Sequence, residues 1–220
     1  MLSRISLMTT LLKLGQNPNQ ILVKLALREA LLGCESVLDI GCGVTMTLRQ
    51  LGVPQTVGVE GYAPSLLEAQ RQNTHDHLVQ GDIRELSQQF QPRQFDACIA
   101  LDVIEHFTKP DGLKLIADLE KIAKKRVVFL TPSGFLPQRH ASNDDLQEHL
   151  SGWTAAEMEQ MGYRVIGLLG PKSLRGEYHS LKRRPAAFWG LVSLAGQCAW
   201  SKYHPAQAAA ILCVKTLAEK

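Results

Sequence analysis

The chain has 220 residues, of which 45% are hydrophobic and 20% are charged, which excludes a disordered or fibrous chain and suits one soluble domain. The formal net charge of +3 is unevenly spread: residues 1–169 carry 16 Lys and Arg against 19 Asp and Glu, whereas residues 170–220 carry 8 against 2. A basic C-terminal quarter indicates either an anionic partner or a solvated surface, and the solvated surface is the simpler interpretation.

Cysteine spacing and apolar runs limit the cellular location. The five cysteines form no C-x-x-C pair, which argues against a zinc or redox motif and fits a reducing compartment. Residues 1–14 lack the small-residue cleavage site of a secretory signal. The longest apolar stretch, residues 185–200, is shorter than the roughly 20 residues that cross a bilayer. We therefore expect a cytoplasmic protein.

The first half of the chain is predicted to alternate between helices and strands. In chain order these are a helix at 18–32, a strand at 36–40, a helix at 45–51, a strand at 56–60, a helix at 64–73, a strand at 77–79, a short helix at 83–88 and a strand at 95–101. Pro and Gly mark several of the helix ends. The strands are near-continuous apolar runs, which is typical of a parallel sheet buried on both faces.

The second half continues the alternation and then departs from it. The predicted elements are a helix at 110–123 capped by Thr108, a strand at 126–131, a loop at 132–145, a helix at 154–162, and strands at 163–169 and 208–216. Thr154 and Glu157 have the spacing of a capping box. We predict one doubly wound α/β domain over residues 1–220, with an N-terminal helical segment at 1–33 and a basic, then apolar, insertion at 170–206.

Each of the first four predicted strands ends beside an acidic residue, namely Asp39, Glu60, Asp82 or Asp102. In an open α/β sheet, ligands bind beyond the carboxyl ends of the strands, so these acids are expected to meet. Glycines after the first strand allow a ligand to approach the backbone. Glu60 follows the turn at the spacing of a ribose-binding acid, and Asp39 would favour a cation over a diphosphate. The pattern predicts a nucleoside site without a pyrophosphate.

Residues 37–43, Val-Leu-Asp-Ile-Gly-Cys-Gly, closely resemble the first motif of the class I S-adenosylmethionine-dependent methyltransferases. The resemblance continues in order through 59–60, 81–83 and 95–106 and covers roughly residues 34–170. It implies a seven-stranded Rossmann-like sheet with the last strand antiparallel, and S-adenosylmethionine as cofactor. Thr45 stands where the family often has a third glycine.

The same resemblance implies which residues contact the cofactor. Glu60 would bind the ribose hydroxyls, Asp82 with Ile83 would bind adenine, and the residues around Asp102 would lie under the sulfonium. The full set of predicted cofactor-binding residues is Asp39, Gly41, Cys42, Gly43, Glu60, Gly61, Asp82, Ile83, Leu101 and Asp102.

His106 and Glu105, directly after the fourth strand, are the predicted catalytic residues. An imidazole titrates near neutral pH, so His106 can serve as a general base; it can equally order the next helix or line the cofactor pocket. Asp102-x-x-Glu105-His106 also resembles a pattern in ubiquinone-biosynthesis-type O-methyltransferases, where a Glu and a His help to bind a divalent cation. Three residues in one turn do not complete such a site, so we predict no metal.

The acceptor side is predicted less sharply. His149 and Trp153 lie where members of the family often place substrate-facing residues, although Trp153 can instead pack against the domain. In the insertion 170–206, the apolar run is expected to form a helix packed near the active site that shapes the acceptor pocket. The alternative is a helix that lies on a membrane surface.

Taken together, the residues predict transfer of a methyl group to an unidentified acceptor. A hydroxyl on a small molecule, or on a lipid- or glycan-linked molecule, is the first hypothesis, and peripheral membrane contact stays open with it. RNA or protein methylation is a second hypothesis. The chain lacks the Asn/Asp-Pro-Pro-Tyr/Phe sequence of many nucleic-acid methyltransferases, which disfavours a nucleic-acid partner. The third is a non-catalytic domain that binds the cofactor and interacts with a partner.

Overall fold

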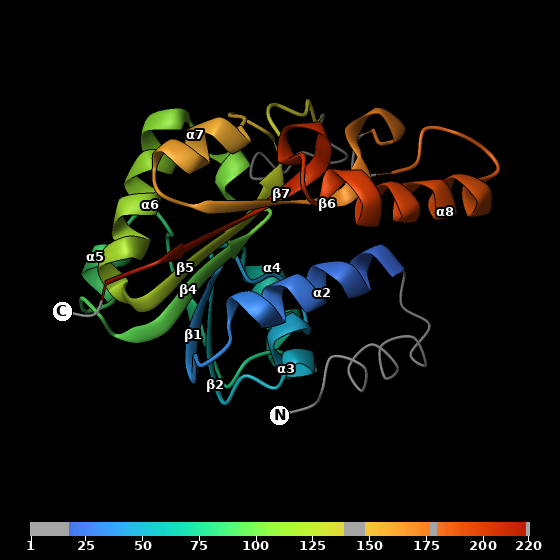
Figure 1. The fold of residues 1–220 in the computed structure, drawn as a ribbon. Coiled ribbons are helices and arrows are strands. Elements are labelled where there is room, and N and C mark those ends of the chain that lie inside the picture. Colours follow the sequence, from blue (N-terminus) through green and yellow to red (C-terminus); the bar gives the residue numbers. More distant parts are fainter. Residues whose placement is uncertain (1–17, 139–147, 177–179, 219–220) are drawn as a thin grey trace.

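The computed structural model describes residues 18–138, 148–176 and 180–218 of the chain. Residues 1–17 of the predicted N-terminal segment, 139–145 of the predicted loop and 177–179 of the insertion lie outside the described residues. One sheet carries the fold, in the order β3-β2-β1-β4-β5-β7-β6 (Figure 1). Its strands are β1 (Ser36–Ile40), β2 (Gln55–Glu60), β3 (His77–Gln80), β4 (Phe95–Leu101), β5 (Ala123–Pro132), β6 (Arg164–Pro171) and β7 (Ala208–Thr216).

The strand directions confirm the predicted fold class. Strands β1 to β5 pair in parallel, whereas β7 runs antiparallel to both β5 and β6. The chain moves outward from β1 to β2 and β3, and then returns to place β4 on the other side of β1. The carboxyl ends of β1 and β4 therefore form the switch point, where an open sheet leaves room for a ligand.

Helices cover both faces of this sheet. They are α2 (Pro18–Ala30), α3 (Thr47–Leu51), α4 (Ala63–Gln72), α5 (Leu86–Gln89), α6 (Lys109–Ile122), α7 (Ala155–Gln160) and α8 (Ala186–Gly196). The predicted caps form: the Thr108 hydroxyl accepts a hydrogen bond from the Asp111 N–H, and Thr154 and Glu157 make a complete capping box. Of the described helices, none combines the length and apolar character needed to cross a membrane.

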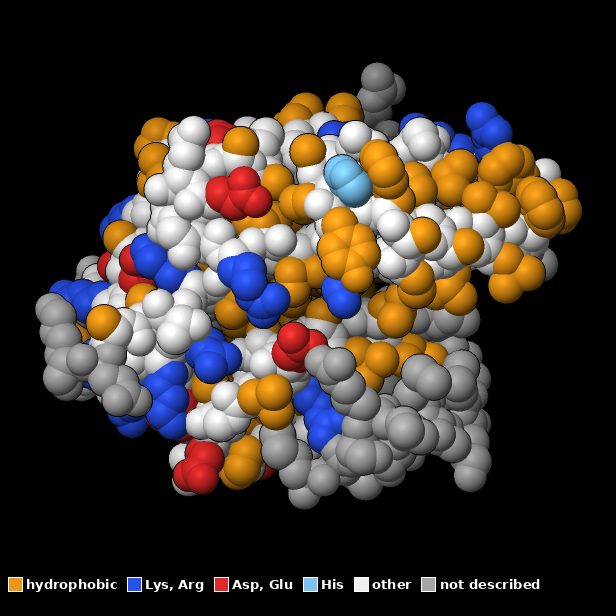
Figure 2. Space-filling view, in the orientation of Figure 1, with side chains coloured by type: hydrophobic (Ala, Val, Ile, Leu, Met, Phe, Trp, Pro, Cys, Tyr) orange, Lys and Arg blue, Asp and Glu red, His pale blue; other side chains and the backbone are white. Residues whose placement is uncertain are grey.

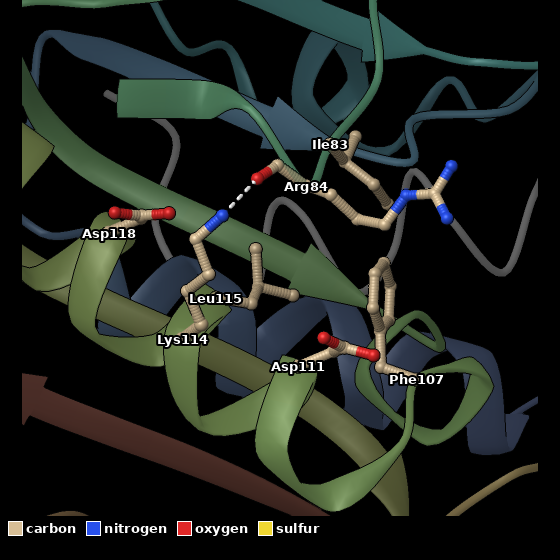
Figure 3. A pocket seen from close by; sticks show the side chains of 7 residues that line it. All are labelled: Ile83, Arg84, Phe107, Asp111, Lys114, Leu115 and Asp118. Atoms are coloured by element: carbon tan, nitrogen blue, oxygen red, sulfur yellow. Dashed lines mark hydrogen bonds between the residues drawn. The ribbon is translucent and has the colours of Figure 1, made fainter. Parts of the chain in front are cut away.

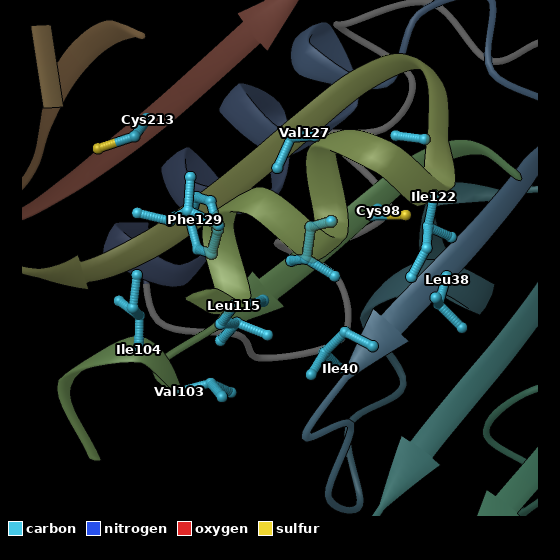
Figure 4. Close-up of a cluster of buried hydrophobic side chains, with 14 of the residues drawn as sticks. Leu38, Ile40, Cys98, Val103, Ile104, Leu115, Ile122, Val127, Phe129 and Cys213 are labelled. Carbon is cyan, nitrogen blue, oxygen red and sulfur yellow. The ribbon is translucent and has the colours of Figure 1, made fainter. Parts of the chain in front are cut away.

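Alternation along β5 divides the core into two layers. Val127 and Phe129 point into the cluster beneath α6 (Figure 4), whereas Val128 and Leu130 point into the opposite cluster beneath α2 and α3. Successive strand residues face opposite sides of a sheet, so one apolar run fills both layers. This is why the strands read as continuous apolar sequence.

Helix bounds differ from the predicted ones where a side chain competes for the backbone. The predicted helix at 83–88 shrinks to Leu86–Gln89, because the Asp82 carboxylate accepts the Arg84 N–H at 2.9 Å and holds a turn there. The helix predicted from residue 45 begins at Thr47, whose N–H donates to the Thr45 hydroxyl at 3.2 Å.

Trp153 belongs to the core, so its predicted contact with substrate is wrong. The side chain is 1% exposed, and its indole N–H donates to the Ile104 carbonyl and the Ser151 hydroxyl at 3.3 and 3.0 Å. The ring packs on α6 at Gly112, where an added Cβ would lie 2.5 Å from it. The alternative, that Trp153 packs against the domain, is the one that holds.

Replacing this anchor should destabilise the whole domain. We expect Trp153→Ala to lower the free energy of unfolding by ~3–5 kcal/mol, because it leaves a large cavity beneath α6. Leu113→Ala, at a position on α6 that is 49% exposed, should change it by less than about 0.5 kcal/mol. Denaturant unfolding followed by circular dichroism measures both, and equal stability of the two variants would contradict the assignment of Trp153 to the core.

Candidate functional site

Glu60 ties the loops that follow β1 and β2. Its carboxylate accepts the Gly43 N–H at 2.9 Å through one oxygen and the Tyr62 N–H at 2.8 Å through the other. The Cys42 N–H donates to the Val59 carbonyl at 3.2 Å, which adds a second link between the loops. Each carboxylate oxygen keeps a further lone pair, so Glu60 can still accept hydrogen bonds from a vicinal diol.

The two glycines of the first turn serve different purposes. Both have positive φ, 62° at Gly41 and 50° at Gly43. A Cβ at Gly41 would lie 2.7 Å from the Val103 side chain, so this glycine allows the turn to pack against the loop after β4. A Cβ at Gly43 would meet no atom within 4 Å. Gly43 therefore borders open space beside Glu60, where a ligand can approach the backbone.

Asp39 and Cys42, two predicted cofactor-binding residues, have buried side chains. Asp39 is 2% exposed and pairs with His75 Nε2 at 3.2 Å, so it acts on a ligand at most through its charge. Burial raises the pKa of Asp39, and the hydrogen bond to His75 opposes this. The Cys42 thiol packs against Gly58, where a Cβ would lie 2.7 Å from the sulfur, which leaves only the Cys42 backbone for a ligand. No sequence signal had marked His75.

The predicted adenine end lies at the loop after β3. Asp82 forms an ion pair with the Arg84 guanidinium at 2.7 Å, and the hydrogen bonds from Arg84 lower the pKa of Asp82. An amino group of a ligand would share this carboxylate with Arg84, a partner that sequence reasoning missed. Gly61 is exposed and faces this loop, since its Cβ would lie 3.6 Å from the Gly81 carbonyl.

A small hollow adjoins this end of the site. Ile83 and Phe107 are among its apolar walls, and Lys114 of α6 closes it by donating to the Arg84 carbonyl at 2.6 Å (Figure 3). The remaining residues around it are Arg84, Asp111, Leu115 and Asp118. The hollow therefore lies beside the predicted adenine residues, and Phe107 connects it to the segment after β4.

Glu105, His106 and His149 come together at the carboxyl end of β4. Their candidate ligand atoms all lie within 4.8 Å of one another, and the two imidazole centroids are 4.9 Å apart. Glu105 and His106 belong to a 3₁₀ turn, Ile104–His106, and His149 approaches from the segment after β5. The N–H groups of Leu150 and Ser151 donate to the Glu105 carbonyl at 2.8 and 3.0 Å and fix this approach.

The Glu105 carboxyl is buried at the carboxyl end of β4. It is 2% exposed and accepts a hydrogen bond from the Thr131 hydroxyl at 3.0 Å. Among the described residues, no Lys or Arg forms an ion pair with it. Burial raises the pKa of Glu105, and the negative charge of Asp102 raises it further. Such a carboxyl is stable in the buried site either when it is protonated or when a cation is bound to it.

Backbone carbonyls orient both histidines in the same way. His106 Nδ1 lies 2.9 Å from the Glu148 carbonyl, and His149 Nδ1 lies 2.7 Å from the Leu136 carbonyl. A carbonyl can only accept, so each Nδ1 carries the proton and each Nε2 keeps its lone pair. Burial lowers the pKa of His106, which favours the neutral ring. This is the orientation that metal-ligating histidines adopt.

Asp102 and Leu101 connect the cluster to the cofactor side. Asp102 has a φ of 54°, unusual for a residue with a Cβ, and its N–H donates to the Leu130 carbonyl at 2.8 Å. This turn ends β4 at Leu101 and places Asp102 near the buried Glu105. Burial raises the pKa of both carboxyls, to about 6 at Asp102 and to about 8 at Glu105, so Glu105 has the higher pKa of this interacting pair.

The structure thus assembles residues that the sequence kept apart. His149 joins Glu105 and His106, so the reason for predicting no metal, an incomplete set of ligands in one turn, no longer holds. Thr131 was missed because a Thr at the end of an apolar strand carries no signal of its own.

Comparisons with known proteins agree with the fold. Residues 38–131 match the model of a family described as "Methyltransferase domain". No curated protein sequence matches the chain. The methyltransferase domain of bacterial CtHen1-CN is 17% identical, with 91% of this chain and 99% of that chain covered and a TM-score of 0.55. A SAM-dependent methyltransferase from Archaeoglobus fulgidus is 15% identical, with 89% and 93% covered and a TM-score of 0.53.

A third comparison is partial. The PH0226 protein from Pyrococcus horikoshii OT3 is 23% identical over 49% of this chain and 50% of that chain, with a TM-score of 0.44, so this chain spans half of its length. The two longer matches share the fold of this chain. With the sheet order, the glycine turn and Glu60, the family match identifies residues 38–131 as a class I methyltransferase domain whose cofactor is S-adenosylmethionine.

Proposed function

We propose that this protein transfers the methyl group of S-adenosylmethionine to a hydroxyl oxygen, and that Glu105, His106 and His149 hold a divalent cation beside the acceptor. The acceptor is a small molecule or a lipid- or glycan-linked molecule. The observation that carries the proposal is the cluster itself: two imidazoles whose Nδ1 atoms face backbone carbonyls, next to a buried carboxyl that no Lys or Arg of the described residues pairs with.

The donor set suits a divalent cation on chemical grounds. Two neutral imidazoles and one carboxylate are ligands that Zn²⁺, Mn²⁺ and Fe²⁺ accept. A cation here would remove the penalty of burying Glu105 in its charged form. The carbonyls of Glu148 and Leu136 are the outer partners that keep both rings in place. When bound, the cation would lower the pKa of a hydroxyl and orient it.

The order of the strands indicates which part of the site would hold the cofactor and which would hold the acceptor. S-adenosylmethionine supplies an activated methyl group, so the protein mainly has to align donor and acceptor. Glu60 and the Gly41–Gly43 turn would hold the cofactor at the ends of β1 and β2. The cluster follows β4, which neighbours β1 in the sheet, so it would hold the acceptor on the adjoining side. A hydroxyl needs to lose its proton, and with both Nε2 atoms ligating the cation, the cation would lower the pKa of the hydroxyl so that the proton leaves to solvent.

Cofactor binding should depend on the charge of Glu60. We expect Glu60→Gln to weaken S-adenosylmethionine about tenfold or more, since a hydrogen bond to a charged group contributes ~1.5–3 kcal/mol. Glu68→Gln, in α4, where the carboxylate contacts Arg71 and Gln72 of the same helix, should bind as the wild type does. Calorimetric titration with S-adenosylmethionine and S-adenosylhomocysteine measures both. A folded wild-type protein that binds neither ligand would contradict the cofactor site.

Cation binding should depend on all three cluster residues. We expect the EDTA-treated protein to take up one equivalent of Zn²⁺ or Mn²⁺, and Glu105→Gln, His106→Ala and His149→Ala each to reduce the affinity about tenfold or more. His77→Ala, at an exposed position in β3, is the matched control. Calorimetry with the metal alone gives the readout without any acceptor. Equal affinity of His149→Ala and the wild type would rule out the cluster as the cation site.

Methyl transfer should then require both halves of the site. Formation of S-adenosylhomocysteine with a panel of catechols and other hydroxylated acceptors is expected to stop with EDTA and to return with added cation. The Glu60 and His149 variants should both be inactive, each with its own binding defect. Turnover that is unaffected by EDTA would favour His106 as a general base without a metal.

A further inference from the structure

Helix α8 and the π-helical turn that continues it, Gln197–Ser201, form an arm along the free edge of the sheet (Figure 1). The arm packs on the edge strand β6 through polar side chains. Ser193, Gln197 and Ser201, spaced four residues apart, are all buried. The Gln197 amide accepts the Gly170 N–H at 2.7 Å and donates to the Gly167 carbonyl at 2.8 Å. This seam satisfies backbone groups of the edge strand.

Glycines in β6 make the close approach feasible. A Cβ at Gly167 would lie 1.9 Å from the Ser201 carbonyl oxygen, and one at Gly170 would lie 2.3 Å from the Ser193 hydroxyl. The arm is therefore seated against β6 by a specific polar interface. The side of the arm that faces away from β6 is then available to its apolar residues.

The apolar side chains of the arm point outward. Phe188 is 56% exposed and Leu191 is 68% exposed, and the smaller Ala195 and Cys198 are exposed along the same helix. Figure 2 shows hydrophobic side chains gathered over the arm. A surface helix of a globular protein turns its apolar side inward, so this arrangement is the reverse of the usual one. The expectation that this run is packed is therefore wrong for Phe188 and Leu191, whereas Trp189, Val192 and Leu194 are half-buried.

Positive charges surround this apolar face. Lys182, Arg183 and Arg184 are exposed directly before α8, and Lys202 is exposed after it. The Arg183 guanidinium lies 4.6 Å from the centroid of the Trp189 ring, at the base of the helix. Residues 180–207 contain no Asp or Glu. Within this stretch, the charged side chains that a covering surface would meet are therefore cations.

The arm ends with two more exposed aromatic residues. Trp200 is 47% exposed and Tyr203 is 67% exposed. The indole N–H of Trp200 donates to the Gln207 side chain at 2.8 Å, and His204 stacks on the Trp200 ring with the centroids 3.8 Å apart, so the polar atom is satisfied while part of the ring stays exposed. Trp and Tyr are the residues that settle at the level of lipid headgroups.

We propose that the arm, together with the residues that flank it (182–203 in all), docks this protein on an anionic lipid surface. Phe188 and Leu191 enter the boundary of the acyl region, and the four cations contact lipid phosphates. A helix with an apolar outer face, a cationic rim and no acid fits a negatively charged bilayer better than a protein partner, whose rim would carry both signs. The arm is too short to span the bilayer and lies in its plane.

The arm also adjoins the candidate site. The Ser133 hydroxyl donates to the Pro205 carbonyl at 2.9 Å, just after the arm, and Lys172, directly after β6, donates to the Ser133 carbonyl. Three residues further along, the Leu136 carbonyl orients His149. Docking would therefore bring the lipid surface to the acceptor side of the site. Docking itself needs no turnover, so it can succeed or fail independently of the proposed reaction.

Vesicle flotation tests the proposal directly. The full-length protein is mixed with vesicles of phosphatidylcholine alone or of phosphatidylcholine with phosphatidylglycerol. We expect binding only to the vesicles that contain phosphatidylglycerol, with a loss of about tenfold or more in Phe188→Ser/Leu191→Ser. Replacing Lys182, Arg183 and Arg184 by Ala should also weaken binding and reduce its salt dependence. Trp189 and Trp200 emission should shift to the blue on binding.

Matched controls separate docking from misfolding and from self-association. Leu67→Ser/Leu113→Ser removes two residues that are 55% and 49% exposed on α4 and α6, and it should bind vesicles as the wild type does. S-adenosylmethionine binding by calorimetry and the mass in solution are measured for every variant. Absence of wild-type binding, or equal binding by Phe188→Ser/Leu191→Ser, would overturn the proposal. So would a dimer that this variant dissociates, if neither form binds vesicles.

Discussion

Two hydrogen bonds to one backbone carbonyl hold the candidate site together. The N–H groups of Leu150 and Ser151 donate to the Glu105 carbonyl and thereby fasten the segment after β5 onto the turn after β4. Without them, His149 would have no fixed place beside Glu105 and His106. Trp153, two residues beyond Ser151, secures the same segment from below, because its indole donates to the Ile104 carbonyl and packs on Gly112. Trp153, which was predicted to contact the substrate, therefore supports the cluster of Glu105, His106 and His149 instead.

The two halves of the site are built by different means. The cofactor half is built from two neighbouring parallel strands, β1 and β2. Glu60, at the end of β2, accepts hydrogen bonds from backbone N–H groups of the loops after both strands. The acceptor half brings together residues more than forty positions apart, and carbonyls of irregular backbone set the tautomer of each imidazole. The Glu60 contacts therefore depend only on the loops after β1 and β2. The cluster of Glu105, His106 and His149 depends on how the segment after β5 is folded.

At the edge of the sheet, the arm packs on β6 through its polar side chains, and its apolar face is therefore left exposed. Strand β6 offers unpaired backbone groups, and Gln197 with Ser193 satisfies them only because Gly167 and Gly170 admit the helix so closely. Once the polar side of the helix is committed to the strand, Phe188 and Leu191 have to face solvent or another surface. Protection of an exposed edge and presentation of a docking face are thus two results of one packing arrangement.

The sequence by itself determined the doubly wound sheet, its final antiparallel strand by resemblance, the helix caps at Thr108 and Thr154, and the glycine turn with Glu60. These features depend on residues close together in the chain, or on apolar periodicity, so their signals are local. Only the tertiary structure decided that His149 joins Glu105 and His106, that Asp39 is committed to His75 and Asp82 to Arg84, and that α8 turns its apolar face outward. Periodicity shows that a helix has an apolar side, but which side is buried depends on what the edge strand offers to bind.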